Sequence, residues 1–332
     1  MRDSEKSIIQ RIRQLSGEGG IARIPLAIGD DAAILRFPSG HEVLVTTDFS
    51  LENVHFRRDW HPPESVGHRC LARGLSDIAA MGGQPFAAFL SLALPAQLPQ
   101  KWVDGFLRGL LTLAKQHAVT LAGGDTAQSP GLGSSAKILV DIVVVGSAPR
   151  GKALRRSGAK PGDSIYVTGT LGAPALALEA LLAQPRKKLH PNQYPAHFYP
   201  QPRLAIGRYL RDHRLASSMI DLSDGLSTDL HHICEESGVG AEVVAEFIPR
   251  ADGGTLEQAL HGGEDYELLF TAPRDRKIPR RIAGGAVTRI GKIKKGRTRV
   301  LLLEGLRRRE LPAGGWEHFK KSATGLHTSG SL

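Results

Sequence analysis

The amino-acid sequence predicts an α+β protein built from two domains. Its 332 residues are many for a single core and enough for two domains of ordinary size. Helical and strand-like segments are mixed without strict alternation, which disfavours one doubly wound sheet. A charged stretch rich in turn residues, SAPRGKALRRSGAKPGD at 147–163, lies near the middle of the chain. We therefore expect an N-terminal domain over 1–148, a C-terminal domain over 149–320 and a flexible tail over 321–332.

The apolar pattern predicts the elements of the N-terminal domain in chain order. Ile8, Ile9, Ile12 and Leu15 fall on one face of a helix near the start of the chain. Proline suits the first turn of a helix, so the next helix should begin at a proline. The remaining elements are expected as a strand over 41–48 ending at Asp48, a helix from Pro62 or Pro63 to about residue 83, a strand over 85–95, an amphipathic helix over 101–118, a strand leading into a loop over 119–125 and a long strand over 136–146.

The C-terminal half follows the same reasoning. Ser223 is expected to cap the helix over 224–237, and Gly238 is expected to end it. The other elements are expected as a strand over 164–170, a helix over 173–184, a polar loop over 185–202, a short strand over 219–221, a loop followed by a strand over 262–273, and strands over 287–293 and 298–305.

The net charge of +10 raises the question of a nucleic-acid partner. Aromatic residues make up only 5% of the chain, so few side chains could stack on bases. The late basic segments RDRKIPRR, GKIKKGRTR and LRRRE are interrupted by Pro, Gly and apolar residues, as in hairpins with solvated edges. We expect no nucleic-acid partner.

Three further features indicate a soluble cytoplasmic protein. No stretch approaches the roughly 18–20 apolar residues that a membrane-spanning helix needs. The N-terminus is charged from residue 2 and lacks the apolar core of a signal peptide. The two cysteines, Cys70 and Cys234, are far apart in the chain and have no metal-binding spacing, as expected for reduced thiols. We expect no membrane association.

Six aspartates lie among small residues, several of them where an apolar segment ends. They are Asp31, Asp48, Asp77, Asp125, Asp221 and Asp224. Neither a Walker P-loop nor a G-x-G-x-x-G turn occurs, so any phosphate would have to be held by carboxylates through metal ions. Mg²⁺ prefers oxygen ligands and usually takes one or two carboxylates together with phosphate oxygens. Each aspartate also has an ordinary interpretation: Asp48 or Asp125 could close a turn, and Asp224 could favour a helix N-terminus. Spacing alone does not show that the six acids meet.

Eight segments occur in an order that resembles one family. They are IGDDAAIL, TTDFSLENVHF, LSDIAAMGGQP, GGDT, RSGAKPGDSIYVTGTLG, IDLSDGLSTDL, GGEDYEL and GWEHF. Together they are similar to thiamine-monophosphate kinases over residues 5–319. The resemblance implies the two-domain α+β (PurM-like) fold of the aminoimidazole-ribonucleotide synthetase superfamily and a homodimer formed through the N-terminal sheet. It also implies that the γ-phosphate of ATP is transferred directly to thiamine monophosphate with the help of several Mg²⁺ ions.

The same resemblance assigns roles to individual residues. The implied metal ligands are Asp31, Thr46, Thr47, Asp48, Asp77, Asp125, Asp221 and Asp224. The implied ATP contacts are Gly124, Asp125, Arg156 and Ser223, and the implied substrate contacts are His55, Glu264 and Trp316. The acceptor is itself a phosphate that is largely ionised at neutral pH, so no general base is expected beyond these ligands. His41, His61, His117, His231 and His232 match no motif and are expected to be structural or exposed.

Two positions depart from the family pattern, and two other functions are alternatives. Gly74 stands where the family usually has Asn, and Leu107 stands where an aromatic residue is sometimes placed near the adenine. One alternative is another ATP-using enzyme of the superfamily; selenophosphate synthase typically has a reactive residue near its N-terminus, whereas no cysteine precedes Cys70 here. The other is a noncatalytic basic RNA-binding protein, which would gain nothing from clustered acids.

Overall fold

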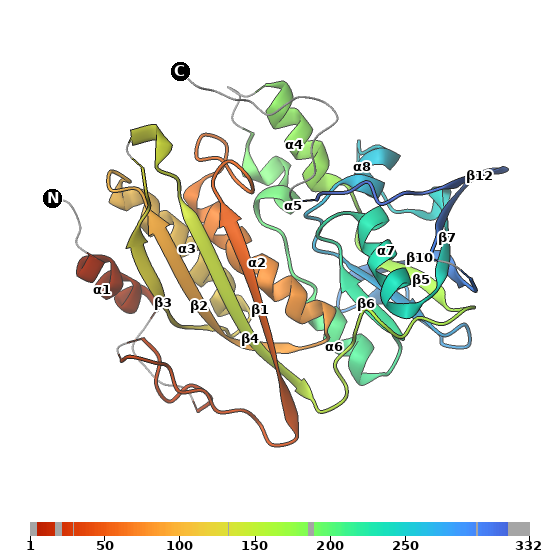
Figure 1. Ribbon diagram of the computed structural model, residues 1–332, viewed down its shortest axis with the longest axis horizontal. Coiled ribbons are helices and arrows are strands. Elements are labelled where there is room, and N and C mark those ends of the chain that lie inside the picture. Colours follow the sequence, from red (N-terminus) through yellow and green to blue (C-terminus); the bar gives the residue numbers. More distant parts are fainter. Residues whose placement is uncertain are drawn as a thin grey trace.

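The structure is a computed structural model that describes residues 5–16, 22–28, 30–131, 133–184, 189–296 and 298–317. Its strands form two sheets, one from each half of the chain (Figure 1). The tail expected over 321–332 lies outside the described residues. The mixed helix and sheet content confirms the α+β fold class. No helix among the described residues is both long and apolar enough to cross a membrane.

The first sheet has four strands in the order β1-β4-β2-β3. These strands are β1 (His41–Leu51), β2 (Gln84–Leu94), β3 (Thr120–Gln128) and β4 (Leu139–Pro149). One face is covered by α2 (Pro63–Ala80) and α3 (Gln100–Gln116), as Figure 1 shows, and α1 (Glu5–Ser16) contacts β3 and α3. Apolar residues around Ile24 and Leu35 cover part of the opposite face.

Helices α2 and α3 approach each other closely because each has a glycine at the contact. A Cβ on Gly67 would lie 1.9 Å from the carbonyl oxygen of Phe106, and one on Gly109 would lie 1.8 Å from that of Glu64. Pro63 occupies the first turn of α2, as expected from its fixed φ angle. The close contact fixes where α2 lies over the first sheet, and this helix carries much of the site described below.

The second sheet has eight strands, seven of them in the order β12-β11-β7-β10-β5-β8-β6, with β9 paired to β10. Its strands are β5 (Ser164–Thr168), β6 (Ser218–Asp221), β7 (Gly240–Val244), β8 (Leu268–Ala272), β9 (Arg281–Ile282), β10 (Gly285–Lys294), β11 (Val300–Glu304) and β12 (Arg307–Glu310). The helices of this half are α4 (Ala173–Ala183), α5 (Pro195–Phe198), α6 (Leu204–Asp212), α7 (Leu226–Ser237) and α8 (Leu256–His261).

One hydrophobic core extends across both halves of the chain. Leu71 and Leu75 of α2 belong to the same cluster of buried side chains as Leu210 of α6 and Phe270 of β8. Helix α2 therefore packs against the first sheet and against elements of the second half. A second core, around Ile220 and Leu230, lies within the C-terminal half. The position of α2 places its polar side chains between the two halves.

Several local predictions are corrected. Strand β3 continues to Gln128, so Asp125 lies within the strand, and its glycine-rich start is accommodated by a register shift against β2. The N-cap of α7 is Gly225, not Ser223, whereas Gly238 does end the helix in a left-handed conformation. The polar loop over 185–202 contains the short helices η2 (Pro191–Gln193) and α5. Helix α6 and strand β7 were not predicted from the sequence.

The departures from the family pattern have packing explanations. A Cβ on Gly74 would lie 2.6 Å from a methyl carbon of Val144, so the glycine lets α2 rest directly on β4, and the helix is intact. Leu107 is fully buried in the core between α3 and its neighbours. The basic segment LRRRE forms the exposed strand β12 at the end of the sheet, in agreement with a solvated hairpin.

Candidate functional site

Helix α2 presents three charged side chains at four-residue spacing. Arg69, Arg73 and Asp77 lie one turn apart along one face, so each step advances about 6 Å along the axis. Arg69 is at the end near His55 and Glu264, whereas Asp77 is at the end near β1 and β6. The row therefore connects residues for which the sequence predicts two different roles.

Four of the predicted metal ligands form an acidic cluster around Asp77. Thr46 and Asp48 alternate with Thr47 along β1, and Thr46 donates its hydroxyl hydrogen bond to Asp77. Asp221 at the end of β6 accepts a hydrogen bond from Ser76 of α2 at 2.6 Å. We name Thr46, Asp48, Asp77 and Asp221 the acidic cluster. It lies where α2, β1 and β6 meet.

The electrostatics of the acidic cluster are unfavourable without a cation. Burial and the neighbouring carboxylate of Asp77 raise the pKa values of Asp48 and Asp221 from 3.8 to about 7. Burial also raises the pKa of Asp77, although the hydroxyl of Thr46 and the charge of Arg156 oppose the rise. Asp221 is only 3% exposed, so solvent does little to relieve the repulsion. Carboxylates under this strain gain from a bound cation.

The donor set of the acidic cluster fits a hard metal ion such as Mg²⁺. Oδ2 of Asp48 is buried and receives no hydrogen bond from a described N–H or O–H group. The ligands are carboxylate and hydroxyl oxygens, which Mg²⁺ prefers. A buried carboxylate oxygen that lacks a hydrogen-bond donor and lies beside two other acids is suited to bind a metal ion.

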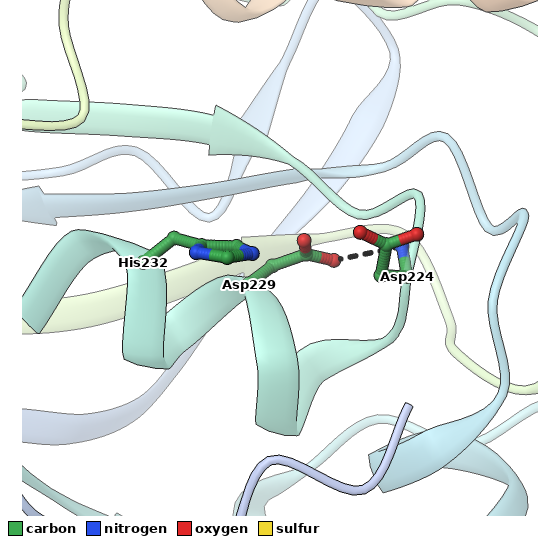
Figure 2. Close-up of side chains that lie close together, drawn as sticks. All are labelled: Asp224, Asp229 and His232. Atoms are coloured by element: carbon green, nitrogen blue, oxygen red, sulfur yellow. Dashed lines mark hydrogen bonds between the residues drawn. The ribbon is translucent and has the colours of Figure 1, made fainter. Parts of the chain in front are cut away.

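The loop between β6 and α7 adds Asp224 to this region. Oδ2 of Asp229 accepts hydrogen bonds from the backbone N–H groups of Asp224 and Gly225, at 3.2 and 3.1 Å. Figure 2 shows the carboxylates of Asp224 and Asp229 with the imidazole of His232, and one ligand atom from each lies within 4.8 Å of the others. Burial, followed by the charges of Asp221 and Asp224, raises the pKa of Asp229 well above its usual value. Asp229 thus shapes the loop that carries Asp224.

Three other predicted metal ligands lie elsewhere. Thr47 donates a hydrogen bond to Asp141 at 2.7 Å, on the face of the first sheet that α2 does not cover. The strand register places Asp125 in one row with Ser91 and Asp141 on that face. Asp31 is exposed, and its backbone N–H donates to Asp30 at 2.8 Å. Within the described ranges, neither Asp31 nor Asp125 hydrogen-bonds or ion-pairs with the acidic cluster.

Arg69 joins two of the predicted substrate contacts. Its Nη2 is 2.7 Å from both carboxylate oxygens of Glu264 and 3.2 Å from the carbonyl oxygen of His55. The guanidinium also donates to the carbonyl oxygen of His197 in α5. Although burial alone would raise it, the charge of Arg69, followed by those of His197 and Arg73, lowers the pKa of Glu264 to about 2. Glu264 is therefore held as a carboxylate.

The third predicted substrate contact, Trp316, and two of the predicted nucleotide contacts, Ser223 and Arg156, lie at or near the β6–α7 loop. Trp316 donates its backbone N–H to the carbonyl of Asp224 at 3.0 Å, and Glu264 does the same to Ser223 at 2.8 Å. The indole of Trp316 is exposed. Arg156 is exposed and acts electrostatically on Asp77 and Asp221. All of these residues thus border the same region.

Gly124, another predicted ATP contact, lies on β3 with a φ angle of +151°. A Cβ there would lie 1.9 Å from the carbonyl oxygen of Leu90, so only glycine allows the two strands to approach this closely. The close packing of β3 against β2 therefore explains why a glycine occupies position 124. Nothing in this packing opposes a contact with a nucleotide.

Sequence reasoning missed several residues that shape the site. Arg69, Arg73, Ser76, Asp141 and Asp229 contact predicted ligands directly. The row of charges at positions 69, 73 and 77, within an otherwise buried helix, was the signal that could have identified the arginines. His61 and His197, both buried, are 3.1 Å apart between their Nε2 atoms, in agreement with a structural role for His61.

Comparison with known proteins identifies the family. Residues 29–148 match the AIR synthase related protein, N-terminal domain, and residues 160–303 match its C-terminal domain. The thiamine-monophosphate kinase of Salmonella typhimurium is 39% identical over 261 residues, covering 75% of this chain and 77% of that protein. The chain belongs to the thiamine-monophosphate kinase family. The family member from Bacillus subtilis is 33% identical over 312 residues, covering 90% of this chain and 94% of its own.

Solved structures agree with this membership. The thiamine-monophosphate kinase of Stenotrophomonas maltophilia superposes with a TM-score of 0.76 at 35% identity, covering 90% of this chain and 95% of its own. A complex of the protein AaThiL with AMPPCP and TMP superposes with a TM-score of 0.73 at 31% identity, covering 95% and 97%. Hydrogenase maturation protein HypE, at 19% identity and a TM-score of 0.70, shares the fold alone. The PurM-like fold expected from the sequence is confirmed.

Proposed function

We propose that this protein is an ATP-dependent kinase that converts thiamine monophosphate into thiamine diphosphate. The observation that carries the proposal is the acidic cluster beside the Arg69–Glu264 pair, in a chain that belongs to this family. An acid-rich site without a dedicated base suits the reaction, because the acceptor phosphate is already ionised. The AaThiL complex, which contains an ATP analogue and TMP, supports the same pair of substrates.

Asp48, Asp77 and Asp221 would hold Mg²⁺ together with the hydroxyl of Thr46, and Asp224 would extend the site. Bound Mg²⁺ would neutralise the charge of the phosphate oxygens. Asp31, Thr47 and Asp125 stay proposed ligands, and the position of Thr47 and Asp125 on the other face of the first sheet favours a separate ion. Several ions in all are proposed.

The side chains have separate tasks in this proposal. Ser76 and Thr46 orient the carboxylates of Asp221 and Asp77 by donating hydrogen bonds. Arg156 would bind nucleotide phosphate with its planar fork, beside the contacts proposed for Gly124, Asp125 and Ser223. Glu264, His55 and Trp316 would contact thiamine monophosphate, and the exposed indole could stack on a thiamine ring. Transfer then needs the two phosphates to be aligned in line.

A kinase assay tests the function directly. The purified protein is incubated with ATP, Mg²⁺ and thiamine monophosphate, with free thiamine as a parallel acceptor. We expect thiamine diphosphate from the monophosphate alone, and loss of product with EDTA. A folded protein that forms no product at saturating Mg²⁺ would refute the assignment, and activity on another acceptor would favour a different enzyme of the superfamily.

We also propose a homodimer that forms through the N-terminal sheet. Val43, Val45 and Phe49 are 46%, 64% and 61% exposed on the face of β1 that α2 does not cover. Adjacent apolar side chains on one sheet face are typical of an interface. We expect Val45→Glu to convert the dimer into a monomer in light scattering, whereas Leu306→Glu at the fully exposed β11–β12 turn leaves it unchanged. A wild-type monomer would refute the proposal.

A cytoplasmic location is also proposed, in keeping with the two free cysteines.

A further inference from the structure

Arg73 occupies the middle of the charged row on α2. It is one turn from Arg69, which binds Glu264, and one turn from Asp77 in the acidic cluster. Its side chain is only 19% exposed. Although burial opposes it, the pKa of Arg73 is raised by Tyr266, Asp48 and Glu264, so the guanidinium stays charged. Arg73 is thus a fixed cation between the proposed metal site and the proposed substrate site.

The hydrogen-bonding capacity of this guanidinium is unused. In the part of the chain that the structure describes, its one polar contact is Nη2 to Oδ1 of Asp48 at 3.7 Å, which is an ion pair but too long for a hydrogen bond. A guanidinium carries five N–H donors in a planar fork. Arg69, by contrast, donates to Glu264, His55 and His197. These donors belong to a side chain that is 19% exposed, and the oxygens of a bound anion would supply the acceptors that they lack.

Arg73 lies beside Asp48, whose second carboxylate oxygen also lacks a hydrogen-bond partner among the described residues. Oδ2 of Asp48 is buried and receives no hydrogen bond from a described donor. The two groups together require both an anion, for the guanidinium, and a cation, for the carboxylate. A phosphate bound to a metal ion supplies both in one ligand, with phosphate oxygens for Arg73 and the ion for Asp48. If Arg73 were only a counter-ion of Asp48, a direct hydrogen-bonded pair would be expected, as Arg69 makes with Glu264.

We propose that Arg73 binds the phosphate of the acceptor and the phosphoryl group during its transfer. The inference rests on the proposed function and adds a catalytic residue to it. An oxygen of the acceptor phosphate forms the new bond to the γ-phosphorus while the bond from that phosphorus to the bridging oxygen of ADP breaks, and ADP leaves with the electron pair. Arg73 stabilises the charge on the equatorial oxygens and aligns the acceptor, because it lies between Asp48 and Glu264.

The test compares Arg73→Ala and Arg73→Lys with Arg108→Ala. Arg108 is a matched control, since it is an exposed arginine of α3 that pairs with Glu64. We expect Arg73→Ala to lower kcat about 100-fold, as removal of one transition-state donor does elsewhere, with KM for ATP near that of the wild type. Arg73→Lys should keep part of the rate, because it retains the charge but not the fork. Millimolar methylguanidinium should restore part of the activity of Arg73→Ala and leave Arg108→Ala unaffected.

A binding measurement separates this inference from the proposed function. Titration calorimetry with thiamine monophosphate, and with inorganic phosphate as a second probe, needs no turnover. We expect binding to Arg73→Ala to be about tenfold weaker. An active wild type with an equally active Arg73→Ala would overturn the inference alone, as would a loss of rate with neither chemical rescue nor weaker phosphate binding. Inactivity of the wild type would overturn the proposed function, and the phosphate titration would then decide the role of Arg73.

Discussion

Replacing Asp48 by asparagine should stabilise the metal-free protein while abolishing its activity. Asparagine has the shape of the protonated aspartic acid, and its amide can donate to Asp77 where Asp48 now shares a proton. The pKa of Asp48 is raised to about 7, so the folded state binds this proton more tightly than the unfolded chain. The free energy of unfolding therefore falls as the pH rises from about 4 to about 7. Asp48→Asn removes that loss.

The size of the effect follows from the same shift. A rise in pKa from 3.8 to about 7 lowers the free energy of unfolding by roughly 4 kcal/mol above pH 7, because each pKa unit is worth about 1.36 kcal/mol. Part of this energy belongs to Asp77, which shares the proton, and Arg73 loses an ion pair worth about 0.5–1 kcal/mol. We therefore expect Asp48→Asn to raise the free energy of unfolding by about 2 kcal/mol at pH 8, and by less at pH 5.

Urea denaturation in EDTA at pH 5 and pH 8 measures this prediction, with the kinase assay in parallel. Asp59→Asn is the control, because Asp59 is 55% exposed and its pKa is lowered, despite some burial, by hydrogen bonding to Arg57. It should change stability little, and in the opposite direction. The reasoning is refuted if Asp48→Asn is less stable than the wild type at pH 8, or if the difference between them is the same at both pH values.

Three further predictions concern α2. Gly74→Ala should lower the free energy of unfolding by about 1–3 kcal/mol, because the new methyl would lie 2.6 Å from a valine methyl of β4; an unchanged urea midpoint would contradict this. Ser76→Ala should weaken Mg²⁺ binding several-fold in calorimetry, since Asp221 loses its 2.6 Å hydrogen bond; unaltered affinity would show that Ser76 does not orient the ligand. Arg69→Met should raise KM for thiamine monophosphate more than KM for ATP. The substitution should also raise the pKa of Glu264 from about 2, which pH profiles of kcat/KM would detect. Equal changes in the two KM values would refute the proposed role of Arg69.

Much of the secondary structure could be predicted from local patterns. Helix α3 was predicted from its apolar stripe, because the buried Phe106 and Leu110 repeat at helical spacing. Helix α6 was missed because it has nine residues and follows a polar, proline-rich stretch. The N-cap of α7 was assigned to Ser223 because serine is a favoured N-cap residue. In the structure the carboxylate of Asp229, inside the helix, accepts hydrogen bonds from the N–H groups of Asp224 and Gly225 instead.

The sequence by itself determined the fold class, the family and the set of acids, because these depend on residue type and on order along the chain. Only the tertiary structure decided which acids meet. Asp48 and Asp221 come together because α2 packs against both β1 and β6, whereas the alternation of side chains along β1 directs Thr47 to the opposite face. The unused donors of Arg73 were also invisible in the sequence, since an arginine acquires or lacks partners only when distant segments pack around it.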